Sequence, residues 1–198
     1  MFKLIYGVFA MTMIFSTASA SELKPQKLPQ PIITGGQPLM ETLAARKSER
    51  TFSKKDIDTQ TLSEILWSAW GISHDEKRTI PTSMNKQNLK VYVLKADGVW
   101  LYNAEINSLE PITDKDMRHL FATQDFVKEA PLTLLYTGTD SKNSPLHAGS
   151  AYQNVGLYCA SKGLNNVVRG YFDYEQVEKA LNLALEEKVI ISQTIGWK

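Results

Sequence analysis

The spacing of apolar positions predicts two helices in the first third of the chain. The first begins at Pro38 and ends near residues 46–49. Proline is favoured at this start, because the N–H groups of the first helical turn have no partner inside the helix and the missing N–H costs nothing. The second begins with a capping box formed by Thr61 and Glu64 and ends at Gly71. The apolar faces consist of Leu39, Met40, Leu43 and Ala44 in the first helix and of Leu62, Ile65, Leu66 and Ala69 in the second.

Alternating and continuous apolar runs predict the strands. Within residues 90–102, two alternating runs flank an Asp97-Gly98 pair, which is typical of a β-hairpin. Residues 132–137 are rich in Leu and Thr and predict a buried strand. Residues 189–195 predict a last apolar strand.

Three further helices complete the pattern. Residues 114–121 predict a short amphipathic helix, and residues 146–162 predict the longest one, which is small and apolar on most sides and ends at Gly163. A last helix begins with Asp173 as its N-cap and continues to about residue 183. Because helices are mixed with strands that are at least partly antiparallel, and no internal repeat is present, the predicted fold class is α+β.

The first 20 residues have the pattern of a secretory signal peptide. Lys3 supplies a positive start, residues 4–15 are apolar, and the small residues that end at Ala20 predict cleavage there. The apolar run is short for a transmembrane helix, although an uncleaved membrane anchor is the alternative. We therefore expect a periplasmic or secreted protein. Residues 21–37 are rich in Pro and Gly and predict an extended arm, which could wrap its own domain or a partner subunit, before a single domain at residues 38–198.

Composition excludes several classes of function. A chain of 198 residues can build one domain with its own hydrophobic core. Its 22 Lys and Arg nearly balance its 21 Asp and Glu, so neither a nucleic-acid-binding basic stripe nor an acidic disordered tail is expected. A single cysteine excludes a disulfide framework and a multi-thiolate metal centre within the chain.

Familiar catalytic motifs are missing from the sequence. No glycine-rich loop of the dinucleotide or P-loop type occurs, and no Gly-x-Ser-x-Gly motif occurs. His74, His119 and His147 are far apart, so we expect surface or capping roles and no metal site. Cys159 lies in the most apolar helix, where a small hydrophobic role is favoured over a nucleophile. No side chain is identified as catalytic.

The segment after the first helix carries a candidate anion site. If the chain is extended there, Arg46, Ser48 and Arg50 point to one side, since residues two apart share a side. Two guanidinium groups and a hydroxyl suit a phosphate dianion. Taken alone, these residues are better explained as a charged helix end that faces solvent, because charged residues are ordinarily exposed.

A second polar cluster lies between a helix and a strand. The loop contains Pro81, Thr82, Ser83, Asn85 and Gln87. Its amides could bind the hydrogen-bonding edge of a heterocycle. The alternative is an ordinary turn, in which the same residue types are common.

Taken together, these motifs resemble the FMN-dependent nitroreductase family. The resemblance rests on Arg46-x-Ser48-x-Arg50, on the Pro81 loop, on Gln153-Asn154 followed by Gly163-Leu164, and on Arg169-Gly-x-Phe172-Asp173, in an order that spans residues 39–197. The compact form is most similar to the small branch allied to the azoline oxidases and dehydrogenases. The family implies a central, mainly antiparallel sheet flanked by helices, and a homodimer that binds two FMN molecules at the subunit interface.

The resemblance also implies roles for individual residues. Arg46, Ser48 and Arg50 would hold the FMN phosphate and ribityl chain, with Lys198 as a third positive charge. Pro81, Thr82, Ser83, Asn85 and Gln87 would approach FMN from the neighbouring subunit or along its pyrimidine edge. Val168, Arg169 and Gly170 would lie against the isoalloxazine, with a backbone N–H near Gly170 directed at N5.

Three functional hypotheses follow. The first is an exported FMN-dependent oxidoreductase that passes two electrons through flavin N5 in ping-pong fashion to or from a small organic substrate. The second is a non-catalytic flavin-binding module with the same fold, and the third is an extracellular interaction domain without flavin. Tyr152, Tyr171 and Phe172 are candidate walls of the cleft, with core packing as the alternative.

Overall fold

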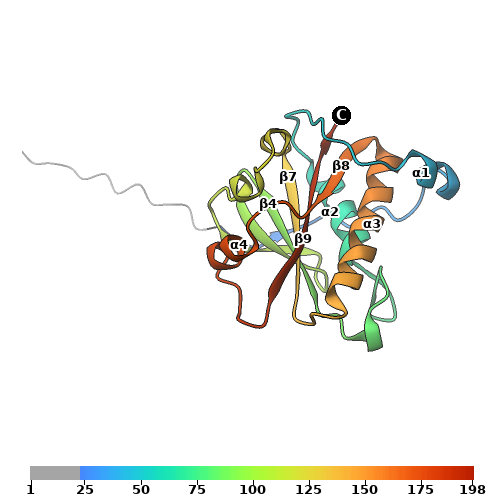
Figure 1. Cartoon of the computed structure of the whole chain (residues 1–198). Helices are drawn as coiled ribbons and strands as arrows, with labels where there is room; N and C mark the ends of the chain where they lie inside the picture. The colour runs from blue at the N-terminus through green and yellow to red at the C-terminus, as the bar shows by residue number, and fades with distance from the viewer. Residues whose placement is uncertain (1–22) are drawn as a thin grey trace, which may run out of the picture.

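A seven-stranded antiparallel sheet organises the computed structural model, which describes residues 23–198 (Figure 1). The strand order is β1-β6-β5-β4-β7-β9-β8, and every pairing is antiparallel. The strands are β1 (Gln26–Lys27), β4 (Leu89–Lys95), β5 (Gly98–Asn103), β6 (Ser108–Thr113), β7 (Leu132–Gly138), β8 (Leu164–Arg169) and β9 (Lys188–Trp197). The α+β class and the mainly antiparallel sheet are thus confirmed.

The remaining elements cover the two faces of this sheet. The helices are α1 (Leu39–Ala45), α2 (Thr59–Trp70), α3 (Ser144–Lys162) and α4 (Tyr174–Ala180). Short 3₁₀ turns are η1 (Ser83–Asn85), η2 (Arg118–Phe121) and η3 (Asp125–Lys128), and β2 (Ile72–His74) pairs with β3 (Lys77–Arg78) in a separate ribbon. In Figure 1, α2 and α3 lie on one side of the sheet and α4 on the other.

The hairpin and the buried strand form where the sequence predicts them. Leu94 pairs with Val99, so the Asp97-Gly98 turn joins β4 to β5 as expected. Gly98 has φ 140°, a conformation that strongly favours glycine. All of β7 is buried, since it lies between β4 and β9 and is covered on both faces. Apolar side chains therefore continue along the strand without alternation.

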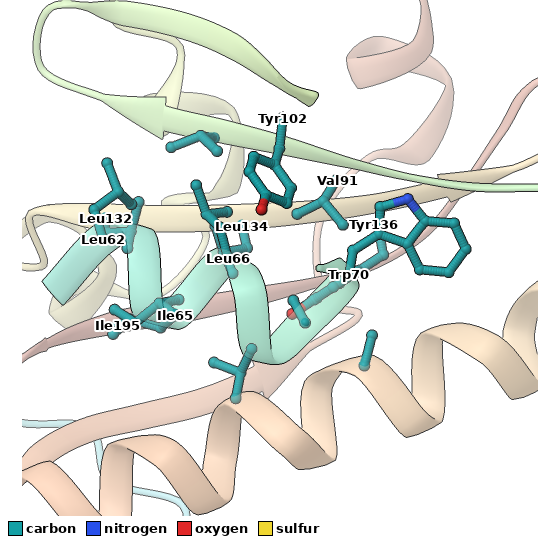
Figure 2. Close-up of a cluster of buried hydrophobic side chains, with 14 of the residues drawn as sticks. Leu62, Ile65, Leu66, Trp70, Val91, Tyr102, Leu132, Leu134, Tyr136 and Ile195 are labelled. Carbon is teal, nitrogen blue, oxygen red and sulfur yellow. The ribbon is translucent and has the colours of Figure 1, made fainter. Parts of the chain in front are cut away.

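The larger core lies between the sheet and the α2–α3 pair. Leu62, Ile65 and Leu66 point from α2 toward the strands, where they meet Leu132 and Leu134 (Figure 2). A second core on the opposite face packs η2, η3 and α4 against the sheet. The predicted apolar face of α2 is confirmed, and the helix is held firmly against the strands.

The predicted capping box of α2 is wrong. Asp58 is the N-cap, and its carboxylate accepts hydrogen bonds from the Thr61 N–H at 2.9 Å and the Thr61 hydroxyl at 2.7 Å. Glu64 is instead buried and accepts hydrogen bonds from the Tyr158 hydroxyl and from Gln60. Burial raises the pKa of the Glu64 carboxyl, but these bonds and the Lys162 ammonium outweigh it and hold the pKa below its usual value.

The arm wraps its own domain over much of its described length. Its strand β1 pairs with β6, and Leu28 is buried in the core. The Pro29 carbonyl accepts a hydrogen bond from the Ser63 hydroxyl at 2.6 Å, and the Gln37 N–H donates to the Ser161 hydroxyl at 2.9 Å. These contacts attach the arm to α2 and α3.

Three predicted helices need correction. Residues 114–121 form only the 3₁₀ turn η2, and the strand β6 just before them was not predicted, because Pro111 and Glu110 interrupt its apolar pattern. The helix α3 begins at Ser144 and is less buried than expected, with Leu146 66% exposed. The apolar stripe of α1 does not face the core: Leu39, Met40 and Leu43 are 64%, 75% and 43% exposed.

The predicted signal peptide lies outside the described residues. Within residues 23–198, no helix combines the length and the apolar character that crossing a membrane requires. Export therefore stays a prediction from the sequence.

Candidate functional site

The segment after α1 is extended and runs beside the edge strand β8. The helix ends at Arg46, which has extended torsions. The Glu49 N–H donates to the Asn166 carbonyl at 2.9 Å, and the Asn165 side-chain amide donates to the Thr51 carbonyl at 2.6 Å. Lys47 and Glu49 form an ion pair with each other. Lys47 and Glu49 are two residues apart and so share one side of the extended segment. This fits an arrangement in which Arg46, Ser48 and Arg50 lie on the other side.

The two arginines of this segment are free of protein partners. Within residues 23–198, neither the Arg46 nor the Arg50 side chain makes a hydrogen bond or an ion pair. The aliphatic part of Arg46 crosses α3 at Gly156, where an added Cβ would lie 3.6 Å from the Arg46 Cγ and Cδ atoms. Both guanidinium groups are therefore available to an anion.

Arg169 lies near Arg50 but has a different task. Burial, and then the charge of Arg50, lower the pKa of the Arg169 guanidinium. That guanidinium donates to the Phe121 carbonyl at 2.6 Å, to the Thr123 hydroxyl at 2.8 Å and to Gln124 at 3.1 Å. Arg169 thus fixes the chain between η2 and η3. Its side chain has few donors left for a ligand.

The outer strand β8 presents a polar position to the α3 side. Strand alternation directs Leu164, Asn166 and Val168 to one face of the sheet. Leu164 belongs to the core beneath α3, whereas Val168 is only half-buried. Asn166 lies against Gly156, where an added Cβ would be 3.6 Å from the Asn166 Oδ1 atom, on the same side as Arg46. After β8, Gly170 is exposed, and its N–H donates to no acceptor in the described part of the chain.

The second polar cluster is a strained loop fixed at both ends. Met84, Asn85 and Gln87 have φ of 52°, 53° and 47°, which costs free energy for residues with a Cβ. At one end, the Ser83 N–H donates to His147 Nε2 at 2.9 Å. At the other, Gln87 accepts from Arg78 at 2.7 Å. The surrounding contacts thus maintain a conformation that the loop would not adopt alone.

The two clusters lie at different ends of α3. The loop with Ser83 contacts His147 in the first turns of the helix, whereas Arg46 crosses it at Gly156. The rise along the helix between these two contacts is about 14 Å. Figure 1 shows α1 beside one end of α3 and the loop, drawn in green, beside the other. One protomer therefore does not bring the two predicted half-sites together.

His147 was missed by the sequence-based prediction. It is 4% exposed, not a surface residue, and its Nδ1 lies 3.2 Å from the Asn88 Oδ1 atom. Because Nε2 accepts the Ser83 N–H, the proton must be on Nδ1, where it is donated to Asn88. The sequence shows a polar loop and, later, a largely apolar helix that contains His147. It does not show that this histidine contacts the loop, because that contact depends on the tertiary fold.

The remaining candidates are placed as follows. Cys159 is fully buried, and burial raises the pKa of its thiol well above the usual value, so the small hydrophobic role is confirmed. Phe172 is part of the core, Tyr171 is 71% exposed and Tyr152 is half-buried. Lys198 follows β9 and is exposed beside the start of β8. No group of metal-ligating side chains occurs within residues 23–198.

The fold and this site define an α+β protein with an unpartnered arginine pair beside the edge of an antiparallel sheet. The family model that matches residues 43–197 is that of the nitroreductase family. The chain therefore belongs to the nitroreductase family, as the sequence motifs indicated.

Individual relatives agree with this assignment. The crystal structure of a "putative nitroreductase" from Ralstonia eutropha JMP134 is 32% identical, covers 98% of this chain and 96% of its own, and superposes with a TM-score of 0.83. A Methanocaldococcus jannaschii protein named "Putative nitroreductase" is 26% identical over 81% of this chain and 91% of its own length. The microcin synthetase McbBCD complex of E. coli contains a chain with the same fold, at 19% identity and a TM-score of 0.65, covering 96% of this chain and 84% of that one.

We predict that His147→Leu loosens the Ser83 loop, because it leaves the Ser83 N–H without its acceptor. A lost hydrogen bond of about 1 kcal/mol should increase the open population about fivefold. Limited trypsin digestion at the exposed Lys86 measures this opening. The control His147→Gln retains an acceptor near the Nε2 position and should be cut at the parental rate. Equal rates for His147→Leu and the parent would contradict the anchoring role.

Proposed function

We propose that this protein is an exported FMN-dependent oxidoreductase that transfers two electrons to or from a small organic substrate. Family membership supports oxidoreductase activity, and members of the family typically use a flavin. The observation that carries the cofactor assignment is the free pair Arg46 and Arg50 beside β8. Arg46 is half-buried and Arg50 is exposed, and neither side chain has a protein partner within the described residues, so both guanidinium groups can bind an anion.

The residues present fit a flavin mononucleotide. A phosphate monoester carries about two negative charges near neutral pH, which two guanidinium groups would balance, with Lys198 as a proposed third positive charge. The unpartnered Gly170 N–H lies further along the same edge, where it would serve an acceptor on the ring. The bulk of the aromatic ring would be covered by half-buried side chains such as Val168.

The chain's own contribution to the reaction is binding and orientation. Arg46, Ser48 and Arg50 would hold the phosphate and ribityl chain, and the exposed backbone N–H of Gly170 would stabilise charge on the acceptor it contacts. A bound flavin supplies the two-electron chemistry at its N5 atom. Because both substrates would use one cleft in turn, we expect ping-pong kinetics. No described side chain is placed as a general acid or base.

A second copy of the chain would complete the site. The loop of Ser83 and Asn85 lies at the other end of α3 from Arg46, so a two-fold dimer is the simplest way to bring both to one cofactor. The exposed apolar surface of the arm and α1 would be buried in such a dimer. This surface consists of Ile32, Ile33, Leu39, Met40 and Leu43. It borders a hollow of about 280 Å³ between the arm and helices α1, α2 and α3.

Export separates the proposed enzyme from the cytoplasmic NAD(P)H pool. The signal-peptide pattern of the first 20 residues supports a periplasmic or secreted location. The electron donor must then be a molecule of that compartment. From the proposed similarity to the azoline-oxidising branch, we infer that the substrates would be small heterocycles or other two-electron donors.

A non-catalytic flavin-binding module is the alternative, and turnover distinguishes it from an enzyme. We predict that the purified protein binds FMN, and that after reduction with dithionite it is reoxidised rapidly by quinones or nitroaromatic compounds. Stopped-flow absorbance of the flavin measures the rate. A flavin that stays reduced with every acceptor, oxygen included, would favour the binding module, and a protein that takes up no FMN would favour an interaction domain.

We predict that Arg46→Ala and Arg50→Ala each weaken FMN binding by roughly one to two orders of magnitude. Each substitution removes a charge-assisted hydrogen bond to phosphate, worth about 1.5 to 3 kcal/mol. Quenching of flavin fluorescence gives the Kd. Riboflavin, which has no phosphate, should be affected less. Lys47→Ala is the matched control, because Lys47 lies on the other side of the same segment and pairs with Glu49. If the arginine variants and this control bind FMN equally well, the phosphate assignment is wrong.

We predict that Met40→Asp converts the protein to a monomer and removes FMN binding with it. The new carboxylate would have to be buried in the dimer interface without a partner, which is costly. Light scattering at micromolar concentration measures the mass, and fluorescence measures bound flavin. Leu185→Asp, at an 88% exposed position beyond α4, is the control and should stay dimeric. A parental protein that is monomeric with FMN bound would refute the shared site.

A further inference from the structure

The side-chain amide of Asn166 has an orientation that its neighbours determine. Gln193 is fully buried, and its Nε2 donates to the Tyr152 carbonyl at 3.2 Å, an atom that can only accept. The same Nε2 donates to Asn166 at 3.0 Å, so the Asn166 atom facing it must be the oxygen Oδ1. The Tyr136 hydroxyl completes the network by donating to the Gln193 Oε1 atom at 2.8 Å.

The nitrogen of the same amide is left without a partner. Asn166 is 7% exposed, yet its Nδ2 donates to no acceptor within residues 23–198. It is also not sealed inside the protein, since the fully enclosed side-chain polar atoms without partners are the Thr133 and Thr194 hydroxyls. A buried donor without an acceptor costs free energy unless water or a ligand satisfies it. The network of Gln193 therefore orients an Asn166 N–H donor that no described residue uses and that is not fully enclosed.

The location of this donor indicates what it contacts. Asn166 Oδ1 and the Arg46 Cγ and Cδ atoms would all lie 3.6 Å from a Cβ placed on Gly156. The two side chains therefore pack next to each other against the same position of α3. The Asn166 backbone carbonyl also holds the segment of Arg46 and Arg50 through the Glu49 N–H. The Asn166 amide thus lies beside the aliphatic part of Arg46, whose guanidinium has no partner within the described residues.

We propose that Asn166 is a binding residue that donates from Nδ2 to an oxygen of the ligand's phosphate-bearing tail, in an orientation set by Gln193 and the Tyr152 carbonyl. This inference rests on the proposed flavin function and adds to it a neutral donor next to the arginines. Because the donor is oriented before the ligand arrives, little conformational entropy is lost when the bond forms. The donor also discriminates, since a ligand without an acceptor at that position leaves it unsatisfied.

The experiment compares FMN and riboflavin on three variants of the purified protein. Asn166→Ala removes the donor and should weaken FMN binding about tenfold, with a smaller effect on riboflavin. Asn166→Asp keeps the acceptor for Gln193 but places an anion beside the phosphate, so FMN binding should fall further than in Asn166→Ala. Tyr136→Phe is the matched control: it removes a hydrogen bond from the same network while the Tyr152 carbonyl still orients Gln193. Its Kd for FMN should equal that of the parent.

Each result bears on a separate statement. Unchanged FMN affinity in both Asn166 variants, with Arg46→Ala still impaired, overturns the role of Asn166 and leaves the proposed function standing. Equal losses for FMN and riboflavin overturn the contact with the phosphate-bearing tail. A loss in Tyr136→Phe as large as in Asn166→Ala means that the effect is transmitted by packing, which also overturns the proposal. A parent that binds no flavin refutes both the proposed function and this inference. Thermal unfolding without flavin checks that each variant is folded. If Asn166→Ala does not fold, Asn166→Ser takes its place.

Discussion

The attachment of the arginine segment to the edge of the sheet is the constraint on which the site depends. An edge strand exposes backbone groups that must find partners. On β8, the Asn166 carbonyl is taken by the Glu49 N–H, and at the end of the neighbouring strand β9 the Trp197 carbonyl is taken by the Ser53 N–H. These two hydrogen bonds hold the segment that follows α1 against the sheet and keep it from extending into solvent. They place Arg46 and Arg50 beside the outer strand instead.

The same edge explains why some polar side chains are committed and others are free. Arg169 lies on the sheet face away from α3, and three hydrogen bonds from its guanidinium hold the chain from Phe121 to Gln124. On the α3 face, Gln193 satisfies the Asn166 oxygen and leaves the nitrogen open. The protein thus uses its buried polar groups to orient one another. The few donors left over, including the Gly170 N–H, are gathered along β8.

Elements whose local pattern agrees with their burial could be predicted from the sequence. The hairpin around Gly98, the strand β7 and the end of α3 at Gly163 are defined by turn chemistry and by apolar runs, and all three are confirmed. The capping box of α2 was wrong because the helix begins earlier, at Thr59, with Asp58 as its N-cap, and the Asp58 carboxylate accepts the Thr61 N–H that the Glu64 side chain would have accepted in the box. Residues 114–121 have helical periodicity, but they follow a strand and close a short connection, so only a 3₁₀ turn fits.

The candidate site could be predicted only in part, for a related reason. Spacing in an extended segment was sufficient to propose Arg46, Ser48 and Arg50 as one group, and the structure keeps that segment extended. The roles of His147 and Asn166 depend on contacts with Ser83 and Gln193, which are distant in sequence and come together only through the tertiary fold. The pattern of residue types along the chain does not indicate such long-range contacts.

The helix α3 connects the two half-sites mechanically. It is a single rigid element of 19 residues that anchors the Ser83 loop through His147 in its first turns and supports Arg46 at Gly156 near its other end. Because a helix barely changes length, the separation between the two half-sites is fixed within a protomer. A two-fold dimer can then place the loop of one protomer opposite the arginines of the other without any rearrangement of either. Under this arrangement, the exposed apolar face of α1 has a structural reason, since it lies beside the arginines and would be covered as the shared cleft forms.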